Sequence, residues 1–113
     1  LKTSGAFHTS LMQPAQLKLV EALNRLLPKM KAPRCDIYMN VTGKKIKAGT
    51  PPSEFIDLLG KQLCSAVLWE PSVRLMIKDG LTEFYEVGPM KQLKAMMKRI
   101  DQETWKSTTN IDV

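Results

Sequence analysis

Short β-prone runs alternate along this chain with longer amphipathic segments, and this alternation restricts the fold more than any other feature. Residues 37–41 (Ile-Tyr-Met-Asn-Val) and 84–87 (Phe-Tyr-Glu-Val) have the composition of strands, and each runs into a glycine-containing turn. Residues 1–4 are expected to form the end of a third strand. Strands that alternate with helices are typical of an α/β layer with parallel strands. Because so few short strands make a thin sheet, we expect the rest of the sheet to lie outside this sequence.

Two helices are predicted in the first half of the chain. The first begins at Thr9 or Ser10, either of which can cap it, and Pro28 ends it because proline cannot donate to the preceding turn. The second is expected to open after Thr50, which would cap it with proline in the first turn. The apolar positions of the first helix share one face: Leu19, Val20, Leu23, Leu26 and Leu27. The second helix is expected to bury Phe55, Ile56, Leu59 and Leu63.

The second half of the chain predicts two further helices. One starts at Pro71 and ends at Gly80, which suits the position just after a helix. The other covers residues 90–100, where apolar residues recur at helical spacing. Residues 44–49 are expected to be a basic loop, and residues 104–113 show no strong periodicity.

The composition favours a globular protein. Hydrophobic residues make up 43% and charged residues 25%, which excludes a disordered polyelectrolyte. No apolar run approaches the roughly 20 residues of a membrane helix, so no membrane partner is expected. The net charge of +6 favours an acidic partner, either nucleic acid or protein. Because no aromatic residues interleave with the dispersed basic ones, we prefer a solvated surface to nucleic-acid binding.

His8 is the only histidine of the chain, and it lies at a predicted strand-to-helix junction. In open α/β folds, functional sites gather where strands end and helices begin. Histidine exchanges protons near neutral pH, so it can serve a nucleophile as base and a leaving group as acid. Its position alone, however, favours a loop histidine that forms local hydrogen bonds.

The residues themselves identify no nucleophile for His8. No serine lies in a G-x-S-x-G elbow, and Thr9 and Ser10 are better explained as helix caps. Cys35 and Cys64 form no C-x-x-C pair, and we expect each to be a buried, reduced thiol. With one histidine and two scattered cysteines, the chain offers no zinc site, and no cofactor is expected.

Three segments resemble motifs of the malonyl-CoA:acyl carrier protein transacylase family. Residues 4–12 (Ser-Gly-Ala-Phe-His-Thr-Ser-Leu-Met) resemble the motif around the catalytic histidine of that family. Residues 61–69, with Lys-Gln-Leu and then Val-Leu-Trp, are similar to its "RQL…V-x-W" segment. Residues 85–93, with Tyr-Glu-Val-Gly-Pro and then a lysine and a leucine, are similar to its "EVGPGKVL" segment. The matches follow the order and spacing of the family and cover nearly the whole chain.

The resemblance implies a fold and a domain assignment. Residues 1–113 are expected to be the C-terminal segment of a malonyl/acyl transferase domain, an α/β-hydrolase-like parallel sheet with flanking helices. In the family, three parts precede the catalytic histidine: the nucleophilic serine in G-H-S-x-G, the arginine that binds the malonyl carboxylate, and the oxyanion hole. The small ferredoxin-like subdomain also precedes it. We therefore expect this segment to lack the nucleophile half and to be inactive alone.

The resemblance also implies an activity and site residues. The family transfers malonyl from malonyl-CoA to the pantetheine thiol of acyl carrier protein through an acyl-serine intermediate. His8 matches the general base and acid, and the main-chain carbonyl of Gln62 matches the group that orients its ring. Phe7 matches a position at which bulk favours malonyl over branched acyl groups, although it could equally fill the core. Met90 departs from the family, which usually has a second glycine there.

Partners and location follow from the same resemblance. An acidic acyl carrier protein would be steered by a basic surface, formed by Lys44, Lys45 and Lys47 or by the helix of residues 91–99. Residues 105–107 (Trp-Lys-Ser) are similar to the mitochondrial-type members, which implies the mitochondrial matrix, with a plastid or the bacterial cytoplasm as alternatives. The alternative is a non-catalytic basic interaction module that reuses the C-terminal fold of the acyltransferases.

Overall fold

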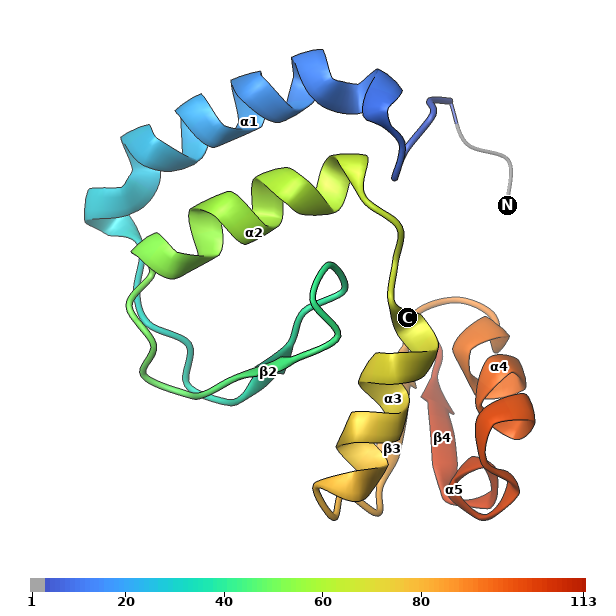
Figure 1. Ribbon diagram of the computed structural model, residues 1–113. Helices are drawn as coiled ribbons and strands as arrows, with labels where there is room; N and C mark the ends of the chain where they lie inside the picture. The colour runs from blue at the N-terminus through green and yellow to red at the C-terminus, as the bar shows by residue number, and fades with distance from the viewer. Residues whose placement is uncertain (1–3) are drawn as a thin grey trace. The chain divides into compact units, whose positions relative to one another are not determined.

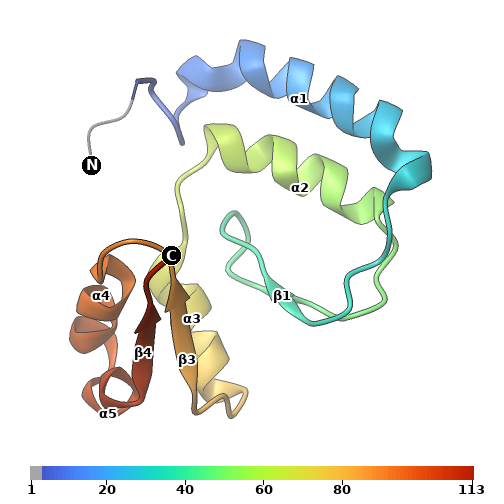
Figure 2. The same ribbon diagram turned by 180° about the vertical axis from the view of Figure 1, so that it is seen from behind.

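The computed structural model describes residues 4–113, so most of the strand end expected over residues 1–4 lies outside the described residues. The chain divides into two compact units, of which the first extends to Trp69 and the second comprises Glu70–Val113. Figure 1 shows the ribbon and Figure 2 the same ribbon from behind. Within the described part, no helix is long and apolar enough to cross a membrane.

Two helices that lie side by side form most of the first unit (Figures 1 and 2). The first ends at Leu26, and Pro28 lies in the 3-10 turn that follows, as expected from its missing N–H. The elements of this unit are η1 (Ser10–Met12), α1 (Gln13–Leu26), η2 (Leu27–Lys29), β1 (Ile37–Tyr38), β2 (Lys45–Ile46) and α2 (Ser53–Cys64).

Neither helix begins with the N-cap residue predicted for it. Neither Thr9 nor Ser10 caps α1, because the chain enters it through the 3-10 turn η1. The Thr9 hydroxyl instead donates to the carbonyl of Ala6 at 2.6 Å. Thr50 does not cap α2 either, since its hydroxyl donates to the carbonyl of Lys47 at 2.7 Å. Both threonines close a turn ahead of a helix.

The packing of α1 against α2 confirms the predicted apolar stripes in part. Phe55 and Ile56 of α2 are buried as expected. Leu26 is 52% exposed, so the stripe of α1 does not extend to its last residue. Gly60 is buried within α2, where a glycine allows a neighbouring helix to approach closely.

The strand predicted over residues 37–41 is shorter than expected, and it belongs to a hairpin. β1 pairs antiparallel with β2, which lies in the segment expected to be a basic loop. The connection is a tight turn in which the Gly43 N–H donates to the carbonyl of Met39 at 2.9 Å, with Gly43 at φ +61°. Parallel pairing was wrong here because so short a connection cannot form the crossover that parallel strands need.

Neither cysteine is fully buried, although both were expected to be. Cys35 is exposed, because it lies in an irregular and largely exposed stretch that precedes β1. Cys64 is half-buried at the end of α2, and both thiols are free.

The second unit confirms the expected parallel pairing. β3 (Phe84–Val87) pairs in parallel with β4 (Thr108–Ile111), and Phe84 lies opposite Thr108. The chain between the strands forms α4 (Gln92–Ile100) and α5 (Gln102–Lys106), which provide the crossover. In both views α4 and α5 lie beside β4 and α3 (Trp69–Lys78) beside β3. β4 and α5 were not predicted from the tail.

The ends of α3 and α4 follow the sequence closely. α3 begins two residues before Pro71 and is followed by Gly80 at φ +91°, the left-handed conformation that glycine adopts without strain. Val73 of α3, 1% exposed, is the most buried core residue described in the chain. Met97 of α4 is also buried.

A carboxylate from β3 holds the start of α4. The Glu86 side chain is 9% exposed and accepts the N–H groups of Leu93 and Lys94 at 2.9 and 2.8 Å. The turn between these elements places Met90 at φ +74°, and the Asn110 amide donates to the Met90 carbonyl at 2.7 Å. Met90 therefore occupies a conformation that favours glycine, at the position where the family usually has one.

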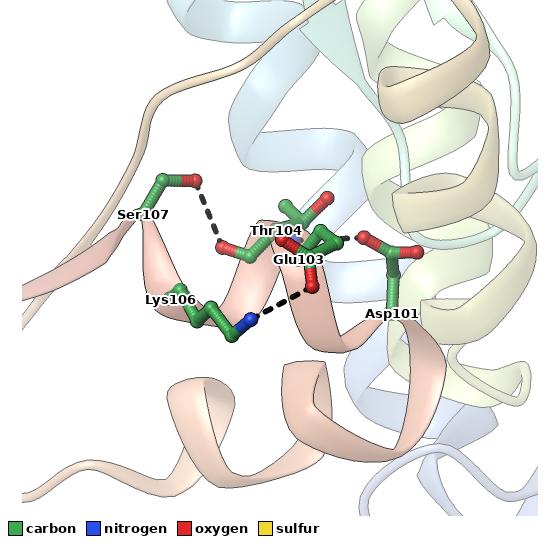
Figure 3. Close-up of polar contacts among 5 residues, drawn as sticks. All are labelled: Asp101, Glu103, Thr104, Lys106 and Ser107. Atoms are coloured by element: carbon green, nitrogen blue, oxygen red, sulfur yellow. Dashed lines mark hydrogen bonds and ion pairs between the residues drawn. The ribbon is translucent and has the colours of Figure 1, made fainter.

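Local polar contacts stabilise α5 (Figure 3). The Asp101 carboxylate caps it by accepting the Thr104 N–H at 2.8 Å. Lys106 pairs with Glu103 at 2.8 Å, and the Ser107 hydroxyl donates to the Thr104 carbonyl at 3.0 Å. The side-chain and then the main-chain hydrogen bond with Thr104 hold the pKa of Asp101 below its ordinary 3.8.

Candidate active site

His8 lies in a tight turn immediately before η1. Its backbone adopts φ +64°, a left-handed conformation that histidine takes more readily than most residues. The His8 N–H donates to the carbonyl of Leu63 at 2.9 Å, which ties this turn to the end of α2. The Thr9–Ala6 hydrogen bond closes the same turn from within. The main chain therefore fixes the direction in which the imidazole leaves the turn.

The imidazole is held by main-chain carbonyls. Its Nδ1 lies 2.9 Å from the carbonyl oxygen of Gln62 and 3.2 Å from that of Ser65. A carbonyl oxygen can only accept, so Nδ1 must carry the hydrogen when these bonds form. Nε2 of the neutral ring then keeps its lone pair and is the atom able to accept a proton.

These carbonyls are available because a helix ends here. The last four carbonyl groups of an α-helix have no partner within it. His8 satisfies two of them, that of Leu63 through its main-chain N–H and that of Gln62 through its ring. The end of α2 thus positions the ring.

A cavity of about 210 Å³ lies beside the histidine. Four leucines and two polar residues line it: Leu19, Leu23, Leu59, Leu63, His8 and Gln62. Among the described residues, no arginine or lysine belongs to this lining. An apolar portion of a ligand fits this wall better than a charged one.

The structure brings together two of the three predicted site residues. His8 and Gln62 are in contact, whereas Phe7 is not part of the cavity lining. Phe7 is 45% exposed, so it does not fill a core in the described part of the chain. Its ring lies over Gly5, with Cε2 3.4 Å from where a Cβ of that glycine would be.

Two contacts of the site were missed from the sequence. The carbonyls of Leu63 and Ser65 bind His8 in addition to that of Gln62. Both residues flank the end of α2, where carbonyls are unpaired, but no end of this helix was predicted from the sequence. Within the described part, no hydroxyl or thiol is among the hydrogen-bond partners of the ring. Among residues 4–113, no three or more His, Cys, Asp or Glu side chains form a group that could hold a metal ion.

Comparisons with known proteins show what the whole chain is similar to. No family model matches the chain. The mitochondrial malonyl-CoA–acyl carrier protein transacylase of Mus musculus is 38% identical over 100% of this chain and 29% of its own length. The structure of the acyl-carrier-protein S-malonyltransferase from Burkholderia pseudomallei matches with a TM-score of 0.81 and 31% identity, covering 100% of this chain and 34% of that one.

A third relative has been solved with a partner. It is a malonyl transacylase in complex with the acyl-carrier protein of a type II polyketide synthase, with a TM-score of 0.78 and 25% identity. The match covers 100% of this chain and 34% of that one. This chain therefore spans about a third of the length of the relatives it matches, as expected for one segment of an acyltransferase. By sequence and by fold, it is similar to a segment of the malonyl-CoA:acyl carrier protein transacylases.

Proposed function

We propose that this chain contributes the acid–base histidine to an enzyme that transfers malonyl from coenzyme A to acyl carrier protein. The observation that carries the proposal is the 2.9 Å contact between His8 Nδ1 and the Gln62 carbonyl. This contact leaves Nε2 as the proton acceptor, which is the state a general base requires. The names of the relatives support malonyl as the group transferred.

The first half of the reaction loads the enzyme. A serine outside these residues gives its hydroxyl proton to Nε2 of His8 as its oxygen attacks the malonyl thioester. When the tetrahedral intermediate collapses, the C–S bond breaks and the imidazolium returns the proton to the departing sulfur. Coenzyme A leaves as a thiol, and malonyl remains on the serine as an ester.

In the second half of the reaction, His8 makes the same proton transfers while acyl carrier protein accepts the malonyl group. The pantetheine thiol of acyl carrier protein gives its proton to Nε2 and attacks the serine ester. The C–O bond breaks, and His8 returns the proton to the serine oxygen. The products are malonyl-thioester on the carrier and free enzyme, so His8 ends each half in its starting state.

The Gln62 carbonyl takes the place that the aspartate occupies in a Ser-His-Asp triad. It fixes the tautomer and aims the ring, although a neutral acceptor stabilises an imidazolium less than a carboxylate does. Because only the main chain of Gln62 acts, its side chain is dispensable for the chemistry.

Phe7 is the residue that we propose borders the acyl group. Its exposed ring would reduce the space beside the acyl carbon once the upstream pocket residues are in place. A branched acyl group carries one more methyl, and a pocket discriminates one methyl by a modest factor. Malonyl is therefore the favoured substrate.

The nucleophile, the oxyanion hole and the arginine for the malonyl carboxylate are proposed to lie outside residues 1–113. The chain alone is then inactive. The partner is an acidic acyl carrier protein, steered by exposed lysines of the hairpin (Lys44, Lys45 and Lys47) or by the basic α4. The mouse relative is named mitochondrial, which supports a location in the mitochondrial matrix.

The test is transfer of radioactive malonyl from malonyl-CoA to a protein that joins this chain to the serine-bearing segment. We expect His8→Ala to abolish the labelled acyl-serine while the fold is retained. Gln62→Ala is the matched control, because its main-chain carbonyl remains, and it should label almost normally. Near-normal labelling of His8→Ala would exclude His8 from the mechanism. Turnover by residues 1–113 alone would contradict the location of the nucleophile.

A second function, a non-catalytic basic interaction module, is favoured by one observation. The three hairpin lysines are exposed, and only Lys45 has an acidic neighbour among the ion pairs seen, Asp36 at 3.9 Å. The coding sequence upstream of Leu1 distinguishes the two functions. A G-H-S-x-G segment followed by an arginine-bearing helix would exclude the module.

A further inference from the structure

α1 and α2 pack tightly against each other at Gly60. This residue is buried, and a Cβ built on it would lie 2.6 Å from Cγ2 of Val20. Real Cβ atoms essentially never come within 3.0 Å of another heavy atom, so any side chain at this position forces a displacement. Val20 cannot easily rotate away, because a β-branched side chain in a helix has one strongly preferred rotamer. The helix separation at this point therefore depends on the absence of a Cβ.

On α2, this contact lies close to the candidate active site. Gly60 precedes Gln62 by two residues in the last turns of α2. Val20 belongs to α1, which continues directly from the turn that holds His8. The two helices lie side by side in both views (Figures 1 and 2). Gly60 therefore determines the distance between α1 and α2 close to the carbonyls that His8 binds at the end of α2.

We infer that Gly60 is a positioning residue for His8, an inference that rests on the proposed role of that histidine. By letting Val20 pack against the backbone of α2, Gly60 keeps α1 near enough for Nδ1–H to reach the Gln62 carbonyl. The residue contacts neither substrate nor the imidazole, and it acts only through the separation of the two helices.

The displacement expected from a methyl group is large enough to break this hydrogen bond. Ordinary van der Waals contact starts at 3.4 Å, against 2.6 Å here, so Val20 or its helix would have to move by about 0.8 Å. If the imidazole moves away from the Gln62 carbonyl by the same amount, the Nδ1–O distance increases from 2.9 Å to well beyond the ~3.2 Å limit of good N–H···O bonds. A ring released from the carbonyls is free to exchange its tautomers.

The experiment uses the single histidine of the chain, whose ring nitrogens give one set of signals in 15N NMR. In the unchanged chain at a pH where the ring is neutral, we expect the Nδ1–H tautomer. Gly60→Ala should lower the ratio of Nδ1–H to Nε2–H roughly fivefold, the factor for the loss of one ordinary hydrogen bond. Val20→Ala combined with Gly60→Ala should restore the original ratio, because it removes Cγ2.

Two single variants serve as controls. Val20→Ala alone leaves the close approach intact and should keep the Nδ1–H tautomer. Ile56→Val loosens the buried face of α2 without adding an atom between the helices, so it should lower stability and leave the tautomer unchanged.

A folded Gly60→Ala chain with an unchanged tautomer ratio would overturn the inference. So would a folded double variant that retains the altered ratio. If circular dichroism shows that Gly60→Ala alone does not fold, the double variant decides the matter by its own ratio. The tautomer is measured without malonyl-CoA, so failure of the proposed transfer reaction would leave this result independent.

Discussion

The carboxylate of Glu86 gives the clearest prediction about stability. It reaches from β3 to the start of α4, whose own N-cap residue, Lys91, makes no side-chain cap. Both oxygens accept main-chain N–H groups, those of Leu93 and Lys94 in the first turn of the helix. These are the N2 and N3 positions whose N–H groups a capping side chain ordinarily satisfies. Glu86 therefore caps α4 from another element.

The perturbation is Glu86→Gln, which preserves the shape of the side chain. One amide oxygen can still accept, but the amide NH2 would face an N–H donor, so one of the two bonds is lost. The negative charge beside the positive end of the helix is lost as well. From the usual value of a cap and of a hydrogen bond to a charged group, we expect a loss of about 1–2 kcal/mol.

The assay is urea unfolding followed by circular dichroism, together with hydrogen exchange of the Leu93 and Lys94 amides. Their protection should fall about tenfold for each 1.4 kcal/mol lost. Glu83→Gln is the matched control, because it makes the same chemical change at an exposed residue and should alter stability by less than about 0.5 kcal/mol. A Glu86→Gln chain as stable as this control would refute the capping role.

Three further predictions concern a turn, a helix cap and the acyl group. Met90→Gly should stabilise the chain by about 1 kcal/mol, because it removes the strain of a side chain at φ +74°; a lower melting temperature would contradict this. The pKa of Asp101 is lowered on folding, so its contribution is present above the ordinary 3.8 and is lost as the pH falls through the lower folded value. The free energy of unfolding of Asp101→Asn should therefore decrease less than that of the unchanged chain when the pH is lowered below 3.8. Equal decreases in the two chains, measured by urea unfolding, would contradict the assignment. In the intact enzyme, Phe7→Ala should reduce the preference for malonyl over methylmalonyl in kcat/KM about tenfold, and an unchanged ratio would exclude Phe7 from the acyl pocket.

Local patterns were enough to predict most of the helices. Pro28 and Gly80 mark helix ends by their own backbone properties, whatever surrounds them. The periodic apolar residues of α1, α2 and α4 likewise depend only on the helical repeat. The caps were less predictable, because Thr9 and Thr50 could equally close the turns in which they are found.

Strand pairing could not be predicted in the same way. β4 has the sequence Thr-Thr-Asn-Ile, which lacks apolar alternation, and it is a strand because it pairs with β3, far from it in sequence. β2 is a strand only because a tight turn returns it to β1. The prediction of one parallel sheet therefore held for β3 and β4 and failed for the hairpin.

The site combines residues that no local pattern connects. His8 and Gln62 are 54 positions apart, and only the family resemblance brought them together before the structure did. From its position and the composition alone, His8 was interpreted as an ordinary loop histidine, and no nucleophile was identified for it. The structure adds the carbonyls of Leu63 and Ser65 and the close approach at Gly60, which depend on how α1 crosses α2. Glu86 was matched only as part of a motif, and its contacts with α4 explain what its carboxylate does there.

The tautomer of His8 in the unchanged chain tests the central claim most directly. The claim is that the end of α2 holds Nδ1–H and leaves Nε2 free to accept a proton. A 15N spectrum of the one histidine, recorded at a pH where the ring is neutral, reports which nitrogen carries the hydrogen. We predict Nδ1–H, with Nε2 unprotonated. A ring that is mainly Nε2–H would show that the Gln62 and Ser65 carbonyls do not hold it, and would remove the structural basis for His8 as the base.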